Sequence, residues 1–240
     1  MKALFLTRVS RPVSEVPRWI VWLLFIGFIS QITFHAYRLN VEPSATPLPH
    51  PPSVSAIKIF GMNENVLLSR LIMLWLQSFD NQPGISIPFK QLSYDRVQLW
   101  LDRAITLDEK SQYPLLAASR IYAEVSDPAR QRQMLEFVYE QFLQDPQRRW
   151  PWLAHGVILA KHRLGDTPLA LKYAHALADI PDTSHIPAWV LQMEIFILED
   201  MNELDAVRVL TGGLLSSGKI TDQHELQFLE KKLQKLSQVE

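Results

Sequence analysis

Hydrophobic positions beyond about residue 60 recur with the period of an α-helix. Apolar side chains return every three or four residues, a spacing typical of helices that bury one face, and do not alternate as in strands. Prolines, glycines and polar clusters interrupt this pattern at regular intervals. Together, the apolar spacing and its interruptions predict four helical hairpins followed by a last helix. The hairpins pair 62–79 with 93–108, 113–125 with 128–144, 151–164 with 167–179, and 187–199 with 203–216, and the last helix covers 222–237.

Capping residues support these boundaries. In Asp127-Pro128 and Thr167-Pro168 a capping side chain precedes a proline at the first helical position, where the missing N–H costs nothing. The other predicted N-caps are Ser93, Asn202 and Thr221, and the predicted helix stops are Asp145-Pro146, Ile180-Pro181 and Gly218.

Three prolines indicate a repeat. Pro114, Pro151 and Pro187 lie 37 and 36 residues apart, and each opens a similar apolar stretch. A fixed period in this range indicates stacked copies of one helical unit. The last helix, 222–237, has apolar residues on one face and lysines on the other, as suits the cap of such a stack.

Corresponding positions of the second, third and fourth units share a further pattern. These positions are Leu115, Ala118, Ser119, Tyr122 and Pro146; Trp152, Gly156, Leu159, Ala170, Ala174 and Pro181; and Ala188, Leu191, Ile195, Ala206 and Leu210. The pattern resembles the tetratricopeptide repeat, although His155 and Ala174 replace a leucine and an aromatic residue of that family. The resemblance implies an all-α, right-handed solenoid of about four helical hairpins with a C-terminal capping helix.

The resemblance also implies a binding surface. In that family the first helix of each hairpin lines a concave groove, and a mixture of aromatic, basic and flexible apolar side chains suits a protein or peptide partner with apolar and acidic character. The groove positions match Tyr113, Arg120, Trp150, Lys161, Trp189 and Met193.

The densest unusual cluster is Arg148-Arg149-Trp150-Pro151-Trp152. In one interpretation it is an aromatic helix start, whose arginines bond the last carbonyls of the preceding helix or stack on indoles. In the other it is a binding anchor, since tryptophan and arginine are enriched among the residues that dominate interface energies. Arg148, Arg149, Trp150 and Trp152 are therefore candidate binding residues beside the groove positions.

An uncharged segment precedes the helical repeats. The 19 residues 19–37 contain no Asp, Glu, Lys or Arg, and as a helix they span about 28 Å, close to the thickness of a bilayer core. Trp19, Trp22 and Tyr37 lie near its ends, where such side chains prefer the membrane interface. A cleaved signal peptide is the alternative, but no small-residue cleavage site follows the segment. We predict an uncleaved transmembrane helix over 19–37.

Charge and proline content predict the remaining organisation. Residues 1–18 carry Lys2, Arg8, Arg11 and Arg18, so the N-terminus is expected in the cytoplasm and the repeats in the periplasm or otherwise outside the inner (plasma) membrane. The proline-rich linker 38–58 is expected to be a spacer or, alternatively, a ligand of a proline-reading module. Residues 59–240 form the predicted helical-repeat domain.

Composition excludes several functions. Beyond residue 42 the chain carries 19 Lys/Arg and 23 Asp/Glu, an acidic balance that argues against nucleic-acid binding. With no cysteine in the chain, disulfides, thiol nucleophiles and cysteine-ligated metals are excluded. Walker, Rossmann, nucleophile-elbow and kinase motifs are also missing from the sequence, so no enzyme activity or cofactor is predicted.

Three smaller features have structural interpretations. His155, His162 and His175 fall in one hairpin, but zinc-binding helices typically space their ligands four residues apart, so packed or surface histidines and no metal site are predicted. An acidic cluster at a turn is interpreted as solvated, and Gly212-Gly213 as a close contact with the last helix. The acidic residues are Glu199, Asp200, Glu203 and Asp205.

The sequence thus favours a membrane-anchored helical-repeat scaffold or assembly factor for another envelope protein. A chaperone role is a variant of this hypothesis. The alternative from a different class is an envelope or cell-wall enzyme built on a helical superhelix, which would need a catalytic acid in a deep groove.

Overall fold

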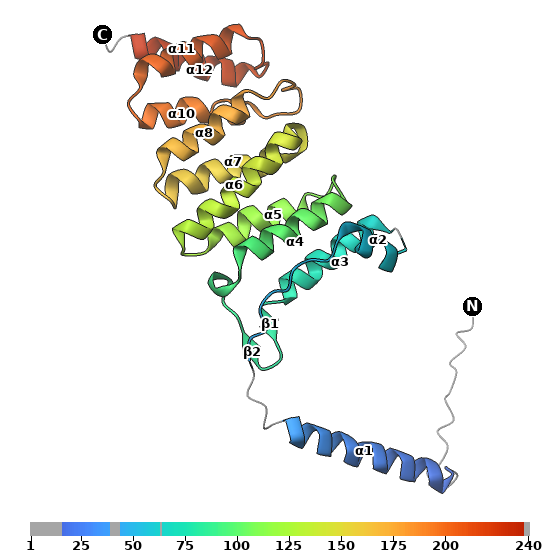
Figure 1. The fold of residues 1–240 in the computed structure, drawn as a ribbon. Helices are drawn as coiled ribbons and strands as arrows, with labels where there is room; N and C mark the ends of the chain where they lie inside the picture. The colour runs from blue at the N-terminus through green and yellow to red at the C-terminus, as the bar shows by residue number, and fades with distance from the viewer. Residues whose placement is uncertain (1–15, 39–43, 63, 238–240) are drawn as a thin grey trace, which may run out of the picture. The chain divides into compact units, whose positions relative to one another are not determined.

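The computed structural model describes residues 16–38, 44–62 and 64–237 of the chain. These residues are mostly helical, with twelve α-helices, two short 3-10 helices and one two-stranded ribbon in the described part (Figure 1). The chain divides into two compact units, which are considered separately. One comprises Met1–Ala45 with Pro83–Ile85, and the other Thr46–Gln82 with Ser86–Glu240.

Helix α1, Arg18–Arg38, is the longest helix of the described residues. Its 18-residue window has a mean hydropathy of 1.6, and its apolar side chains are exposed from Trp19 to Tyr37. Among the described residues it is the one helix long and apolar enough to cross a membrane. Its bounds agree with the predicted segment 19–37 to within one residue. The basic residues Lys2, Arg8 and Arg11 lie outside the described residues.

The second unit contains the predicted helices with some breaks. The helix predicted over 113–125 starts at Tyr113 as expected, but α5 ends at Arg120 and the 3-10 turn η3 follows it. The helix predicted over 187–199 is divided at Gln192. The elements that follow α1 along the chain are α2 Val54–Phe60, α3 Asn65–Ser78, β1 Asn81–Gln82, β2 Ile85–Ser86, η2 Phe89–Gln91, α4 Tyr94–Leu107, α5 Tyr113–Arg120, η3 Tyr122–Glu124, α6 Pro128–Gln144, α7 Pro146–His162, α8 Thr167–Ala178, α9 Ala188–Leu191, α10 Met193–Asp200, α11 Leu204–Ser216 and α12 Gln223–Ser237.

Consecutive helices of this unit pack against one another in chain order (Figure 1). Contacts also join alternate helices, because α5 touches α7 and α4 touches α6. One apolar core runs from Leu48 to Ile197, and a smaller one lies under α12. The smaller core consists of Ile195, Leu198, Val207, Ile220, Leu229 and Leu236. Helix α12 therefore covers the end of the unit, as expected from its one apolar face.

Aspartates cap the helices more often than the sequence pattern predicts. Asp127 accepts hydrogen bonds from the N–H groups of Ala129 and Arg130, as predicted. The predicted caps Thr167 and Thr221 are wrong by one residue, because Asp166 and Asp222 accept the corresponding bonds. Ser93 is the N-cap residue of α4, as predicted, but its side chain makes no cap bond. The predicted cap Asn202 is wrong, because it lies in a turn with φ of 62° and Glu203 is the N-cap of α11. Aspartate is a better N-cap than threonine, and its negative charge also interacts favourably with the helix dipole.

The junction between α6 and α7 also differs from the prediction. The predicted stop at Asp145-Pro146 is confirmed, because α6 ends there. The predicted helix start at Pro151 is wrong, because α7 already begins at Pro146 and contains Pro151. Asp145 ends α6 and its side chain accepts from the N–H of Arg148, so one residue serves both helices. Pro151 costs α7 one backbone hydrogen bond. Gly218, by contrast, follows α11 with φ of +67°, as predicted for a helix stop.

Residues 46–53 of the predicted spacer are part of the second unit. Thr46 exchanges hydrogen bonds with the side chain of Gln82, at 2.8 and 2.9 Å. Arg96 and Trp100 of α4 donate to the carbonyl oxygens of Leu48 and Pro49. Leu48 is buried in the main core, and α2 begins at Val54. The extended backbone of a proline-rich segment leaves its carbonyls unpaired, and α4 supplies the donors.

The interpretation of Gly212-Gly213 as a close helix contact is wrong. A Cβ atom built on either glycine meets nothing within 4 Å, so both face open space. Both lie inside α11, and α12 covers a different side of that helix.

Candidate binding surface

The candidate binding residues all lie on helices α5, α7, α9 and α10. Tyr113 opens α5 and Arg120 ends it, while the cluster from Arg148 to Trp152 occupies the first turns of α7. Tyr113 and Trp189 are 40% and 47% exposed, and Arg120 and Arg148 are also exposed. The half-buried members are Trp150, Trp152, Lys161 and Met193. Arg149 is the buried one, with only 4% of its surface exposed.

Trp150 and Trp189 form an aromatic pair between successive hairpins. Their ring centroids lie 6.0 Å apart with an interplanar angle of 69°, an edge-to-face arrangement that favours the pair beyond simple burial. Trp150 also packs on the main core, whereas almost half of Trp189 stays exposed. Contact with the partly buried Trp150 therefore restricts the position of the exposed Trp189 ring.

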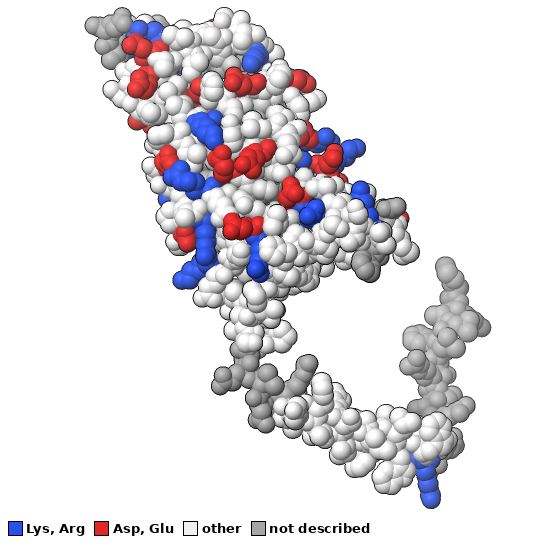
Figure 2. Space-filling model, viewed as in Figure 1, with Lys and Arg blue, Asp and Glu red and all other residues white. Residues whose placement is uncertain are grey.

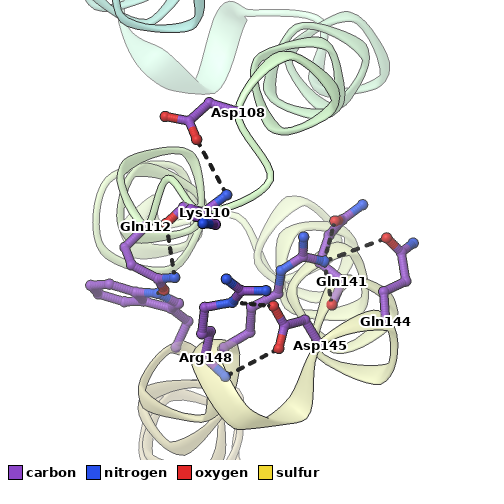
Figure 3. Close-up of polar contacts among 9 residues, drawn as sticks. Asp108, Lys110, Gln112, Gln141, Gln144, Asp145 and Arg148 are labelled. Carbon is purple, nitrogen blue, oxygen red and sulfur yellow. Dashed lines mark hydrogen bonds and ion pairs between the residues drawn. The ribbon is translucent and has the colours of Figure 1, made fainter. Parts of the chain in front are cut away.

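Trp152 is fixed by a polar contact to the preceding hairpin. Its indole N–H donates to the side-chain oxygen of Gln112 at 2.6 Å. The Gln112 amide lies within 3.4 Å of the Lys110 carbonyl oxygen (Figure 3). Gln112 directly precedes α5. This contact joins α7 to the start of α5, and the Trp152 N–H is satisfied within the chain.

Arg149 bonds the end of the preceding helix. Its guanidinium donates to the backbone oxygen of Gln141 at 2.7 Å and to the Gln141 side-chain oxygen at 2.9 Å. Gln144 lies at 3.4 Å. Figure 3 shows Gln141 and Gln144 on α6 beside the start of α7. Burial lowers the pKa of Arg149, and these oxygens replace the lost water. Arg149 therefore stabilises the junction of α6 and α7.

Arg148 is arranged differently from its neighbour. Its Nε lies 2.5 Å from the carboxylate of Asp145, and half of the Arg148 side chain is exposed (Figure 3). Asp145 also caps α7, so the arginine remains near the helix start while its outer N–H groups face solvent. Of the two arginines, Arg148 is the one available to a partner.

A polar pocket of about 460 Å³ adjoins these arginines. Its lining combines carboxylates, amides and guanidiniums from α4, α6 and α7, and it contains no histidine or serine. The lining residues are Asp102, Ile105, Thr106, Glu109, Gln141, Gln144, Asp145, Arg148 and Arg149. Sequence reasoning missed Gln141, Gln144 and Asp102, because polar residues on amphipathic helices carry no local sign of a shared pocket. The pocket can exchange hydrogen bonds with a polar group.

Lys161 forms an ion pair within the chain. Its ammonium bonds the carboxylate of Asp200 at the end of α10, and its side chain is only 27% exposed. Met193 packs on the main core. Arg120, at the end of α5, is exposed and its positive charge acts on His155. The exposed candidates are therefore Tyr113, Arg120, Arg148 and Trp189.

The three histidines of the third hairpin have separate surroundings. His155 lies 3.8 Å from Glu124, and burial, followed by the charge of Arg120, lowers its pKa. His175 bonds Glu194 at 2.8 Å, which raises its pKa. His162 is exposed at the end of α7. Over the ranges that the structure describes, no three metal-ligating side chains gather in one place.

The acidic cluster is partly paired. Glu199 bonds Lys232 of α12, and Asp200 bonds Lys161 of α7. Asp205 is almost fully exposed and lies 3.6 Å from Arg208. All four residues are exposed, as expected for a solvated turn, and two of the carboxylates also join α10 to its neighbours.

No protein-family model, curated protein or solved structure matches the chain.

Proposed function

We propose that the chain is a membrane-anchored helical-repeat scaffold or assembly factor that binds a protein or peptide partner. In this proposal the hairpins form a right-handed solenoid of the tetratricopeptide type. Two packing features support it. The first helices of the second and third hairpins touch, α5 with α7, and the second helices of the first and second hairpins touch, α4 with α6. Helix α12 covers the last hairpin.

The observation that carries the binding role is the Trp150–Trp189 pair. A large ring that is held by a second ring and still 47% exposed is costly to leave in water. Such aromatic residues are typical interface anchors. Tyr113 is exposed at the start of α5, and Arg120 and Arg148 add positive charge on the same set of helices. A partner segment with apolar and acidic side chains fits this combination.

Helix α1 is the proposed membrane anchor. It is long and apolar enough to span a bilayer, and its side chains are exposed throughout. The basic residues before it favour a cytoplasmic N-terminus, which assigns the helical unit to the periplasmic side of the inner membrane.

Partner capture tests the binding role. The full chain is extracted in a mild detergent, and bound proteins are identified by mass spectrometry for the wild type, Trp189→Ala and Arg120→Glu. We expect one stoichiometric partner for the wild type and at least a tenfold loss for each variant. Lys161→Glu is avoided, because it would place a carboxylate beside Asp200.

The matched control is Val209→Ala, which changes a 72% exposed apolar residue of α11. It should retain the partner, and the thermal unfolding of all variants should resemble that of the wild type. Recovery of the same partner at wild-type yield by folded Trp189→Ala and Arg120→Glu would contradict the proposed surface. A large set of unfolded clients in place of one partner would identify the chaperone variant of the function.

A further inference from the structure

Helices α2 and α3 leave a wide apolar surface exposed. Helix α3 buries Ile72, Met73 and Leu76 in the core, while Leu67, Leu71 and Leu74 are 50–65% exposed. The spacing of these three leucines places them along one stripe of the helix. We call this surface the α2–α3 face, and it consists of Ile59, Met62, Val66, Leu67, Leu71 and Leu74. Soluble surfaces rarely gather so many large apolar side chains without an occupant.

The charges around this face are mostly basic. Helices α2 and α3 contain Lys58 and Arg70 and no acidic residue, and the N-cap of α3 is the exposed Glu64. On the face of the second unit that Figure 2 shows, acidic and basic side chains are interspersed. An exposed apolar stripe with basic residues beside it has the composition of a helix that lies in a membrane interface. Lysine and arginine at such a helix attract anionic headgroups.

The chain between α1 and this unit is short. Seven residues, 39–45, separate Arg38 from Thr46, whose backbone is hydrogen bonded to Gln82. Even a fully extended chain of this length reaches at most about 29 Å. Helix α2 starts eight residues after Thr46, at Val54. Residues 46–49 are hydrogen bonded to α4 and Gln82, so they do not lengthen the connection between α1 and the helical unit. A longer connection would allow the unit to lie further from the bilayer.

We propose that the α2–α3 face lies in the interface of the bilayer that α1 crosses, with Lys58 and Arg70 near anionic headgroups. This inference rests on the proposed anchoring by α1. It assigns lipid as the occupant, because the basic flank and the short connection both favour the membrane surface. The leucines of α3 then enter the boundary between headgroups and acyl chains, and the helical unit is held against the membrane.

Spin labels on the full chain test this arrangement. The wild-type chain has no cysteine, so each label site is unique. Phe28→Cys marks α1, Leu71→Cys marks the α2–α3 face, and Val209→Cys marks exposed α11 as the matched control. Each protein is reconstituted in nanodiscs that contain phosphatidylglycerol. The accessibility of the label to oxygen, which concentrates in lipid, is compared with its accessibility to a water-soluble nickel chelate.

We expect the spin labels at positions 28 and 71 to be more accessible to oxygen than to the nickel chelate, and the label at position 209 to be more accessible to the chelate. Leu74→Cys, also on the face and 65% exposed, repeats the measurement should Leu71→Cys fold poorly. Replacing Lys58 and Arg70 by Glu should reduce the ratio of oxygen to chelate accessibility at position 71 at least twofold.

The outcomes separate this inference from the anchor. If the label at position 28 is more accessible to oxygen and the label at position 71 more accessible to the chelate, the membrane contact of α3 is overturned and the anchor is retained. A water signal at 28 overturns the anchor, and the contact with it. Protection of position 71 from both reagents indicates a protein occupant, such as a second copy of the chain, and also overturns the inference.

Discussion

Trp100 donates its indole N–H to the carbonyl oxygen of Pro49 at 2.8 Å. Trp100 is 7% exposed, and the centroid of its ring lies 4.6 Å from the ring centroid of Trp75. One side chain of α4 therefore bonds the proline-rich segment and packs against α3. This contact, with that of Arg96 to Leu48, makes residues 46–49 part of the helical unit.

Replacing Trp100 by Phe should keep most of the ring packing and remove the bond to Pro49. We expect a loss of about 1 kcal/mol in the free energy of unfolding, since a typical hydrogen bond contributes about this much. Denaturant unfolding of the full chain in a mild detergent measures it. Trp189→Phe, which shortens an exposed ring, should change the stability by less than about 0.5 kcal/mol. Equal losses in both variants would show that the Pro49 bond is unimportant.

The proline-rich segment shows why parts of the fold were predictable and others were not. Its extended backbone follows from the local sequence, because proline forbids a helix there. Its donors lie on α4, 48 and 51 residues further along the chain, and no local pattern indicates them. The same holds for Lys161 with Asp200, which are separated by 39 residues.

The helices themselves were predictable because their signals are local. Apolar spacing predicted helices where α3 to α12 lie, and Asp127-Pro128 marked the start of α6 correctly, whereas α2 begins inside the predicted linker 38–58. The boundaries failed where two adjacent residues both qualify as caps, as with Asp166 and Thr167. Of the site, the sequence identified Trp150 and Trp189 individually. That their rings meet depends on how α7 and α9 pack, which the sequence pattern alone does not determine.

Arg149 and Arg148 should differ sharply in their effect on stability. Arg149→Met leaves the buried oxygens of Gln141 without a donor, so we expect a loss of about 2–3 kcal/mol. Arg148→Met removes an exposed pair with Asp145 and should cost less than about 1 kcal/mol. Thermal and denaturant unfolding of the two variants compares them. A larger loss for Arg148→Met would contradict the assignment of Arg149 as the structural arginine.

Asp166 should stabilise α8 in a pH-dependent way. The N–H of Leu169 and the guanidinium of Arg132 lower the pKa of its carboxyl. Because the folded pKa is depressed, this stabilisation is present above the ordinary pKa of 3.8 and is lost as the pH falls through the folded value. Asp166→Ala should cost about 1 kcal/mol at pH 7, as for other caps, and less near pH 3.

The matched variant for this cap is Asp166→Asn, which keeps an acceptor for the Leu169 N–H and removes the charge. Its cost at pH 7 should be smaller than that of Asp166→Ala. Unfolding free energies of the three proteins between pH 3 and 7 make the comparison. A difference between wild type and Asp166→Ala that stays constant over this range would rule out the carboxylate as its source.

His175 should stabilise the contact between α8 and α10 at acidic pH. Its hydrogen bond to Glu194, and then the charges of Glu194 and Asp179, raise its pKa above the ordinary 6.5. A raised folded pKa gives stabilisation that is complete below 6.5 and disappears as the pH rises through the folded value. Since His175 is 62% exposed, its replacement by Gln should cost only about 0.5 kcal/mol near pH 5.5, and almost nothing near pH 8.5.

Unfolding of wild type and His175→Gln at the two pH values measures this effect, and an NMR titration of the imidazole locates its pKa directly. In a Glu194→Gln background the cost of His175→Gln near pH 5.5 should shrink. An imidazole pKa below 6.5 would contradict the pairing with Glu194.

Gly213→Ala should stabilise the protein. Gly213 lies inside α11 with no positive φ, and a Cβ atom built on it meets nothing within 4 Å. Alanine therefore adds no clash, and it reduces the backbone freedom that the unfolded chain loses on folding. We expect a gain of about 0.5–1 kcal/mol, the difference in helix propensity between the two residues. Gly212→Ala should behave similarly. The control is Gly218→Ala, which should be destabilising because Gly218 has φ of +67°. Denaturant unfolding compares the three variants, and a loss of stability in Gly213→Ala would show that α12 approaches this side of α11 after all.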